Sequence, residues 1–150
     1  RQESPTTVSL VLVATDGTPL PAGRPGQYVS VAVRLPDGAR QIRQYSLTGD
    51  HGEGEWAISV KRIDASVAED GTAVPAGEVS THLHRNVFEN DVLSVSHPFG
   101  DLVLDESDAP LLLVSAGIGT TPIIGMLHNL ARTGSDRPVT VVHADRSPAG

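Results

Sequence analysis

The stretch RQYSLTGD, Arg43 to Asp50, determines how the first two-thirds of the chain are expected to fold. It follows the alternating run QYVSVAVRL and the polar turn PDGARQ, as a strand would. Within four residues it carries a cation, an aromatic ring and a hydroxyl, on Arg43, Tyr45 and Ser46. These groups suit a phosphate, a flat ring and a ring nitrogen or carbonyl, respectively. The segment predicts a strand that binds a phosphorylated aromatic cofactor, and an ordinary barrel strand is the alternative.

Short runs of alternating apolar and polar residues continue on both sides of this segment, with turn-forming clusters between them. Since no long helical pattern separates them, they predict a small antiparallel barrel or sandwich. A short helix is expected around STHLHRNVF, with Ser80 or Thr81 as its cap. The strand-like runs are VSLVLVAT, QYVSVAVRL, RQYSL, WAISVKRI and DVLSVSHPFGDLVL.

The pattern changes near residue 108. APLLLVSAG is a continuous apolar run, typical of a parallel strand buried on both faces. It leads through GIGTTP into IIGMLHNLAR, which has helical periodicity, and Gly134 is expected to end that helix. PVTVVHAD then supplies a second apolar strand. Because one βαβ unit buries little core, we expect a β-domain over 1–107 and the start of a truncated α/β domain over 108–150.

Composition narrows the classes of function. The formal charge of −7 disfavours a nucleic-acid binder, and no apolar run approaches the ~20 residues of a membrane span. The N-terminal residues lack a signal-peptide pattern, and the chain contains no cysteine for disulfides or thiolate metal ligands. His82 and His84 are spaced poorly for a shared metal. These features predict a cytoplasmic protein with no metal, nucleic-acid or membrane partner.

Two glycine-containing turns are candidates for binding phosphate. GIGTTP follows a strand and opens a helix, whose N-terminal amides favour an anion. It lacks the third glycine of the full dinucleotide fingerprint, so a purely steric role is the alternative. GEVSTHLH would open the shorter helix, and its alternative is a merely capped helix. Two such turns and Arg43 would neutralise two pyrophosphates, as a flavin dinucleotide and a nicotinamide dinucleotide require. Tyr28 and Tyr45 are expected to share one face of the sheet.

Four motifs in this order, RQYSL, GEVSTHLH, VSHPFGDL and SAGIGTTP, resemble the ferredoxin–NADP reductase superfamily. The resemblance is strongest to the reductase portion of bacterial flavohaemoproteins, the nitric oxide dioxygenases, and extends from about Val8 onward. It implies a six-stranded antiparallel Greek-key barrel that holds FAD, followed by a nucleotide-binding α/β domain.

The resemblance also implies the site residues by position. Tyr45 and Ser46 would lie near the isoalloxazine, as the residues closest to the chemistry. The implied FAD-binding residues are Tyr28, Arg43, Gln44, Tyr45, Ser46, Gly77, Val79 and Ser80. The implied NAD(P)H-binding residues are Gly117, Ile118, Gly119, Thr120, Thr121 and Pro122.

The implied function is hydride transfer from NAD(P)H to FAD, with electrons passing on to an acceptor. In a flavohaemoprotein that acceptor is the haem of a globin domain, which this chain lacks. The alternatives are an FAD-binding fragment without turnover, or a reductase that serves an iron–sulfur or oxygenase partner. The preference between NADH and NADPH stays open, because HADR places Asp145 and Arg146 side by side.

Overall fold

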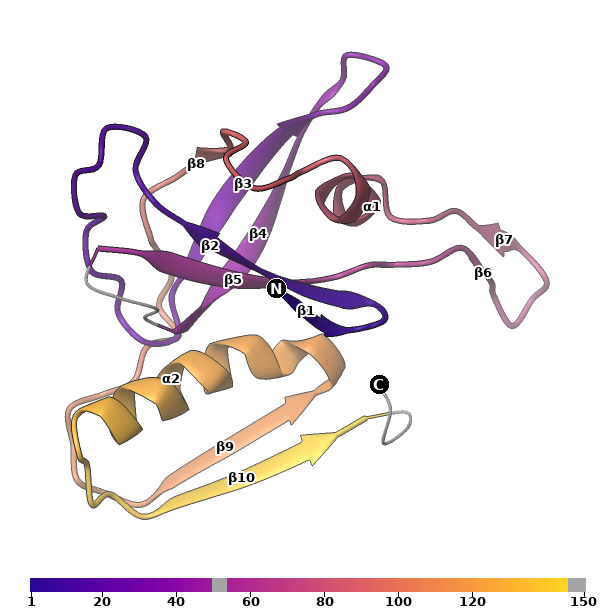
Figure 1. The fold of residues 1–150 in the computed structure, drawn as a ribbon. Coiled ribbons are helices and arrows are strands. Elements are labelled where there is room, and N and C mark those ends of the chain that lie inside the picture. Colours follow the sequence, from indigo (N-terminus) through magenta and orange to yellow (C-terminus); the bar gives the residue numbers. More distant parts are fainter. Residues whose placement is uncertain (50–53, 146–150) are drawn as a thin grey trace.

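The structure is a computed structural model that describes residues 1–49 and 54–145. Its main feature is a six-stranded antiparallel sheet in the order β1-β2-β5-β4-β3-β8 (Figure 1), which confirms the fold class predicted from sequence. Among the described residues no pairing joins the edge strands β1 and β8, so the curled sheet is open at this seam. The strands are β1 (Gln2–Ser4), β2 (Thr7–Leu12), β3 (Tyr28–Arg34), β4 (Arg40–Gly49), β5 (Trp56–Lys61) and β8 (Ser94–Val95).

One apolar core fills the concave side of this sheet. Alternate residues of β3 and β5 point into it, because successive strand side chains face opposite ways. The helix α1 (Glu78–Arg85) covers the core through Val79 and Leu83, which are almost fully buried. The sequence prediction for this helix was wrong at both ends. Gly77 is the N-cap in place of Ser80 or Thr81, and the helix ends before Phe88.

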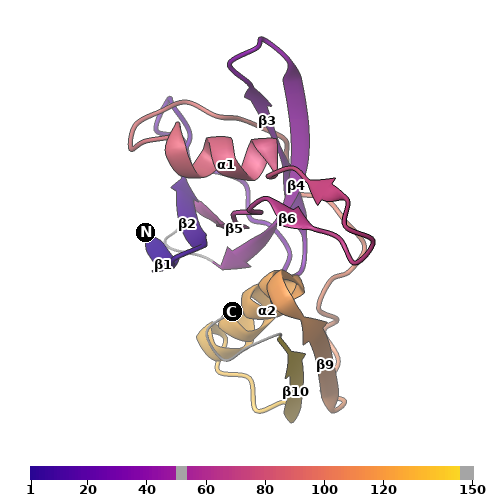
Figure 2. The same ribbon diagram turned by 90° about the vertical axis from the view of Figure 1, so that its right-hand side faces the viewer.

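The predicted strand over residues 91–104 is also much shorter than expected. Only β8 and an isolated bridge between Tyr28 and Phe99 pair with β3. Pro98 lies between these two pairings, and proline cannot donate to a ladder. Conversely, a two-stranded hairpin, β6 (Ser66–Val67) with β7 (Ala73–Val74), forms inside the long segment expected to be a turn. The hairpin projects from the body of the molecule (Figure 2).

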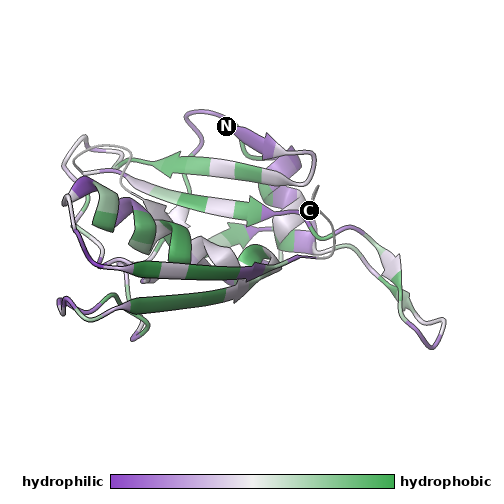
Figure 3. Cartoon of the chain, turned by 90° about the horizontal axis from the view of Figure 1, so that it is seen from below, coloured by the Kyte–Doolittle hydropathy of each residue, from purple (hydrophilic) through white to green (hydrophobic). Residues whose placement is uncertain are grey.

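The C-terminal part is the predicted strand–turn–helix–strand unit, called here the βαβ unit. Its elements are β9 (Leu111–Ala116), the 3₁₀ turn η1 (Gly117–Thr120), α2 (Thr121–Arg132) and β10 (Val139–Ala144). The two strands pair in parallel from Leu111 and Val139 onward. The expectation that β9 is buried on both faces was wrong, since Leu112 is 63% and Val114 65% exposed. Figure 3 shows how apolar these two strands are.

Helix α2 lies between the sheet and the β9–β10 pair (Figure 1) and packs against β4. The approach is close at Gly125, where an added Cβ would lie 2.5 Å from the carbonyl oxygen of Leu47. The βαβ unit therefore rests on the strand that carries RQYS. Among the described residues, no helix is long and apolar enough to cross a membrane.

Candidate functional site

The register of β3 against β4 sets the directions of the RQYS side chains. Tyr28 lies opposite Ser46, Val29 opposite Tyr45 and Val31 opposite Arg43. Opposed residues share a face, and neighbouring residues along a strand do not. Tyr28 and Ser46 therefore lie on one face, and Arg43 and Tyr45 on the other. The expectation that both tyrosines share a face was wrong, because Tyr28 pairs with Ser46, the residue that follows Tyr45. The two tyrosines therefore point to opposite faces.

Each tyrosine has a distinct environment. Tyr45 packs against the core, and this burial raises the pKa of its phenol, with the charge of Arg43 opposing the shift more weakly. The ring of Tyr28 lies 4.3 Å from that of Phe99, at an interplanar angle of 59°. A Cβ on Gly100 would come within 2.7 Å of the Tyr28 ring. The VSHPFGDL segment thus supports Tyr28 by close packing.

Arg43 reaches the N-terminus of α1 through a chain of hydrogen bonds. Its Nη2 donates to Oε1 of Gln41 at 2.8 Å, and Nε2 of Gln41 donates to Oε2 of Glu78 at 2.5 Å. Arg43 also donates to the carbonyl of Ile42, and no carboxylate in the described part of the chain pairs with it. The two motifs RQYS and GEVS, far apart in sequence, therefore meet at one surface.

Gln41 and Glu78 were missed from the sequence. Gln41 lies two residues before Arg43 and therefore on the same face of β4, a spacing that could have indicated it. Gln44, by the same alternation, lies on the opposite face with Ser46.

The first turn of α1 offers backbone donors and few side chains. Helix geometry leaves its leading N–H groups without intrahelical acceptors. The Ser80 hydroxyl donates to the carbonyl of Gly77 and accepts from the amide of Ile63, and the Val79 side chain is 2% exposed. A Cβ on Gly77 would lie 2.7 Å from the Ser80 hydroxyl. Val79 and Ser80 can thus serve an anion only through their main chain.

The turn after β9 opens onto a cleft of about 450 Å³ between the βαβ unit and the outer face of β1, β2 and β5. Gly117 has a φ of +50°, and a Cβ at Gly117 or Gly119 would meet nothing within 4 Å. The Thr121 hydroxyl donates to the carbonyl of Ile118 within the turn. The predicted residues that line the cleft are Gly117, Ile118, Thr120 and Thr121.

The opposite wall of the cleft carries Lys61, which the sequence analysis missed. Lys61 ends β5, is partly buried and has no ion-pair partner in the described part of the chain. Thr48, two residues beyond Ser46, lines the same cleft. A lysine at the end of an alternating strand gives no signal of this role, because the facing turn lies more than fifty residues away in the sequence.

The carboxyl edge of β9–β10 completes the cleft. The Ser115 hydroxyl lies 2.9 Å from Nδ1 of His143, and Nε2 of His143 lies 3.8 Å from a carboxylate oxygen of Asp145. Both His143 and Asp145 line the cleft. Arg146, which was weighed with Asp145 for nucleotide preference, lies outside the described residues.

The arrangement fits two dinucleotides better than a metal. A guanidinium beside a helix N-terminus suits one pyrophosphate. Gly117, which has no steric neighbour and lines the cleft with Lys61, allows a second pyrophosphate to approach the backbone closely. Among the residues described, no group of three or more histidines, cysteines or carboxylates could hold a metal ion.

Comparison with known proteins shows what the chain is similar to. No family model matches the chain. The flavohemoprotein of Deinococcus radiodurans is 46% identical over 143 residues, which are 95% of this chain and 33% of that protein. The crystal structure of the flavohem-like FAD/NAD-binding domain of nitric oxide dioxygenase from Vibrio cholerae superposes with a TM-score of 0.86 at 37% identity, covering 99% of this chain and 60% of that one. The chain is therefore homologous to flavohaemoproteins over 95% of its length, and its fold matches that of the FAD/NAD-binding domain of nitric oxide dioxygenase.

The homology is to the reductase portion of flavohaemoproteins. It spans about one third of the length of the curated relatives that it matches. Phthalate dioxygenase reductase, described as modular for electron transfer from pyridine nucleotides to [2Fe-2S], superposes with a TM-score of 0.74 at 30% identity, covering 98% of this chain and 41% of that one.

Proposed function

We propose that this chain is an FAD-dependent NAD(P)H oxidoreductase module. The chemistry that bound FAD would supply is to accept a hydride from the nicotinamide and to pass electrons on to an acceptor. The observation that carries the proposal is the hydrogen-bond chain from Arg43 through Gln41 to Glu78. This chain of bonds connects β4 to the N-terminus of α1 at one surface. Both elements are proposed to contact FAD, so they must lie side by side.

The chain itself contributes binding and orientation. Arg43 and the leading amides of α1 hold the FAD phosphates, and Tyr45 shapes the pocket on the Arg43 face. Tyr28, Gln44 and Ser46 remain proposed FAD contacts from the other face of β3–β4, and Ser46 and Tyr45 remain the proposed residues nearest the reacting ring.

NAD(P)H is proposed to bind in the cleft at the 3₁₀ turn. The residues proposed for it are Gly117, Ile118, Gly119, Thr120, Thr121 and Pro122, with Lys61 facing them. Open space at both glycines supports this assignment, because phosphate oxygens can then approach backbone amides. Lys61 adds a compact positive charge from the barrel side.

The electron acceptor is proposed from the relatives. A globin haem is the acceptor that homology to flavohaemoproteins favours. A second candidate is an iron–sulfur partner, favoured by the similarity to phthalate dioxygenase reductase. A cytoplasmic location is proposed for the chain, and either acceptor would be compatible with it. Reduction of purified globin or of a [2Fe-2S] protein by the FAD-loaded chain and NADH would separate the two.

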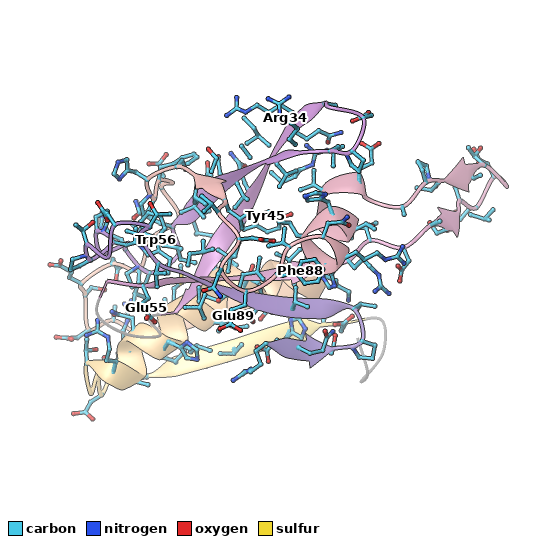
Figure 4. The ribbon with its side chains drawn as sticks, turned by 45° about the horizontal axis from the view of Figure 1, so that its top comes forward. Arg34, Tyr45, Glu55, Trp56, Phe88 and Glu89 are labelled. Atoms are coloured by element: carbon cyan, nitrogen blue, oxygen red, sulfur yellow. The ribbon has the colours of Figure 1, made fainter. Side chains whose placement is uncertain are left out.

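Titration with FAD, followed by fluorescence quenching, tests the cofactor site. Arg43→Ala should weaken FAD binding by about 1.5–3 kcal/mol, the contribution of charge-assisted hydrogen bonds to a phosphate. Arg34→Ala is the matched control, because Arg34 lies near the outer end of the β3–β4 hairpin, away from Tyr45 (Figure 4), and its side chain donates to the carbonyl of Gly38. Equal affinity of the Arg43 variant and the parent would remove Arg43 from the site.

A further inference from the structure

The Arg137 side chain joins the α2–β10 connection to the segment that leads from the sheet into β9. It lies in the connection between α2 and β10, two residues before β10 begins. Its Nε donates to the carbonyl of Ala109 at 2.5 Å, and its Nη1 donates to the Asp105 carboxylate at 2.8 Å. Weaker contacts join Nη1 to the Asp105 carbonyl at 3.4 Å and Nη2 to the Ser107 hydroxyl at 3.3 Å. All its acceptors belong to the segment 105–110, which connects the sheet to β9.

The environment of Arg137 differs from that of an ordinary surface arginine. Its side chain is only 4% exposed, although its partner Asp105 is 67% exposed. The pair Arg62–Asp64 spans two residues along the chain, and its arginine is 25% exposed. A buried guanidinium must use its donors, because an unpaired buried charge is costly. Arg137 meets that need with acceptors on three residues 28 to 32 positions away, so it fixes the shape of the whole segment.

This contact lies at the far end of the strands from the Gly117 turn, so a small rotation at the contact moves the turn by a larger distance. It lies at the amino ends of β9 and β10, whereas Gly117 and His143 lie at or near their carboxyl ends. Six residues of strand span about 20 Å. A rotation of about 5° at the clamped end therefore moves the turn by about 1.7 Å. Misplacement by about 1 Å can cost about a hundredfold in rate when reacting groups must align.

We infer that Arg137 is a positioning residue that holds the βαβ unit in one orientation on the barrel. By fixing segment 105–110, it keeps the Gly117 turn opposite Lys61 and the cleft at a constant width. Close packing of Gly125 on Leu47 supports the same orientation from the middle of α2. The inference concerns geometry alone and goes beyond the proposed function, so it does not depend on which dinucleotides bind.

Spin-label distances test this inference directly. The chain has no cysteine, so cysteines introduced at Ile42 on β4 and Thr140 on β10, both exposed, can be labelled without background. Double electron–electron resonance on the doubly labelled full chain should give one narrow distance distribution. Arg137→Ala should at least double its width. Arg137→Lys should also widen it, because an ammonium cannot reproduce the planar fork.

Two further variants make the result decisive. Arg62→Ala, which removes the Arg62–Asp64 ion pair next to β5, should leave the distribution unchanged. Asp105→Ala combined with Ser107→Ala removes both side-chain acceptors without emptying a buried position, and it should broaden the distribution even if Arg137→Ala does not fold. A broad distribution in the parent, or parental widths in the Arg137 and acceptor variants, would overturn the inference. Failure to bind FAD would count against the proposed function and leave this result unaffected.

Discussion

The sheet and the βαβ unit solve the problem of burying apolar surface differently. In the sheet, Val29, Val31 and Ile58 are 0% exposed and belong to a core shared with α1. In the βαβ unit, the buried cluster is Leu113, Ile123 and Met126, at 4–8% exposure, and β10 is exposed along its length. The sheet carries its own core, whereas the βαβ unit depends on the docking of α2 against β4 and, in our inference, on Arg137. The proposed FAD site thus lies on the self-supporting part, and the proposed nucleotide cleft lies at the joint between the parts.

The largest expected effect comes from opening a cavity in the sheet core. Ile58→Ala should lower the free energy of unfolding by about 3–4 kcal/mol, measured by urea denaturation, since a fully buried side chain leaves a cavity that relaxes poorly. The control Val141→Ala, at a position 45% exposed on β10, should change it by less than about 0.5 kcal/mol. Similar losses for both variants would erase the contrast between the two regions.

A smaller effect is expected at the docking contact. Gly125→Ala places a methyl group against the Leu47 carbonyl and should cost about 1–3 kcal/mol, because the overlap exceeds the gain in helix propensity. At Gly119 an added Cβ would meet nothing within 4 Å, so Gly119→Ala serves as the stability control. If Gly125→Ala stabilises the chain, α2 does not dock on β4 as closely as described.

At α1 the effect should be smaller again. Ser80→Ala removes the acceptor of the Ile63 amide and the bond to the Gly77 carbonyl, so the unfolding free energy should fall by about 1–2 kcal/mol. Ser94→Ala, on an exposed strand position, is the matched control. FAD affinity per folded molecule should change little, because only the main chain of Ser80 is proposed to contact phosphate. A large affinity loss without a stability loss would assign the hydroxyl to FAD.

The smallest predicted effect is a pH dependence. Hydrogen bonds from Ser107, and then from Arg137, lower the pKa of the Asp105 carboxyl. A lowered folded-state pKa adds stability above the unfolded value of about 3.9, and this stability is lost as pH falls through the folded value. Asp105→Asn should therefore flatten the acid side of the stability profile slightly, and Asp64→Asn gives the comparison for an ordinary surface pair. An unchanged profile would mean that Asp105 is not held by these donors.

Periodicity predicted much of the fold, because local pattern and tertiary structure agree there. Alternation located the main strands, and helical spacing located α2, in which Ile123 and Met126 are buried. The predictions that failed depend on contacts distant in sequence. The burial assumed for Leu112 and Val114 needed a covering element that the pattern cannot specify, and the cap of α1 depends on Ile63 reaching Ser80.

The candidate site shows the same division. Motif order predicted Arg43 and the Gly117 turn as binding residues, which stays a prediction; the structure places Arg43 beside α1 and Gly117 in the cleft opposite Lys61. Sequence reasoning missed Gln41, Glu78 and Lys61, since their roles arise only when β4 meets α1 and β5 faces η1. It also placed Tyr28 and Tyr45 on one face, because the register of β3 on β4 cannot be deduced from either strand alone.

Rapid-mixing absorbance of the FAD-loaded, desalted chain with excess NADH, repeated with NADPH under anaerobic conditions, tests the central claim most directly. The account predicts that the chain retains flavin and that at least one nucleotide bleaches the flavin absorbance in a single fast phase. Retained flavin that stays oxidised with both nucleotides would contradict the oxidoreductase assignment and leave a flavin-binding protein in its place.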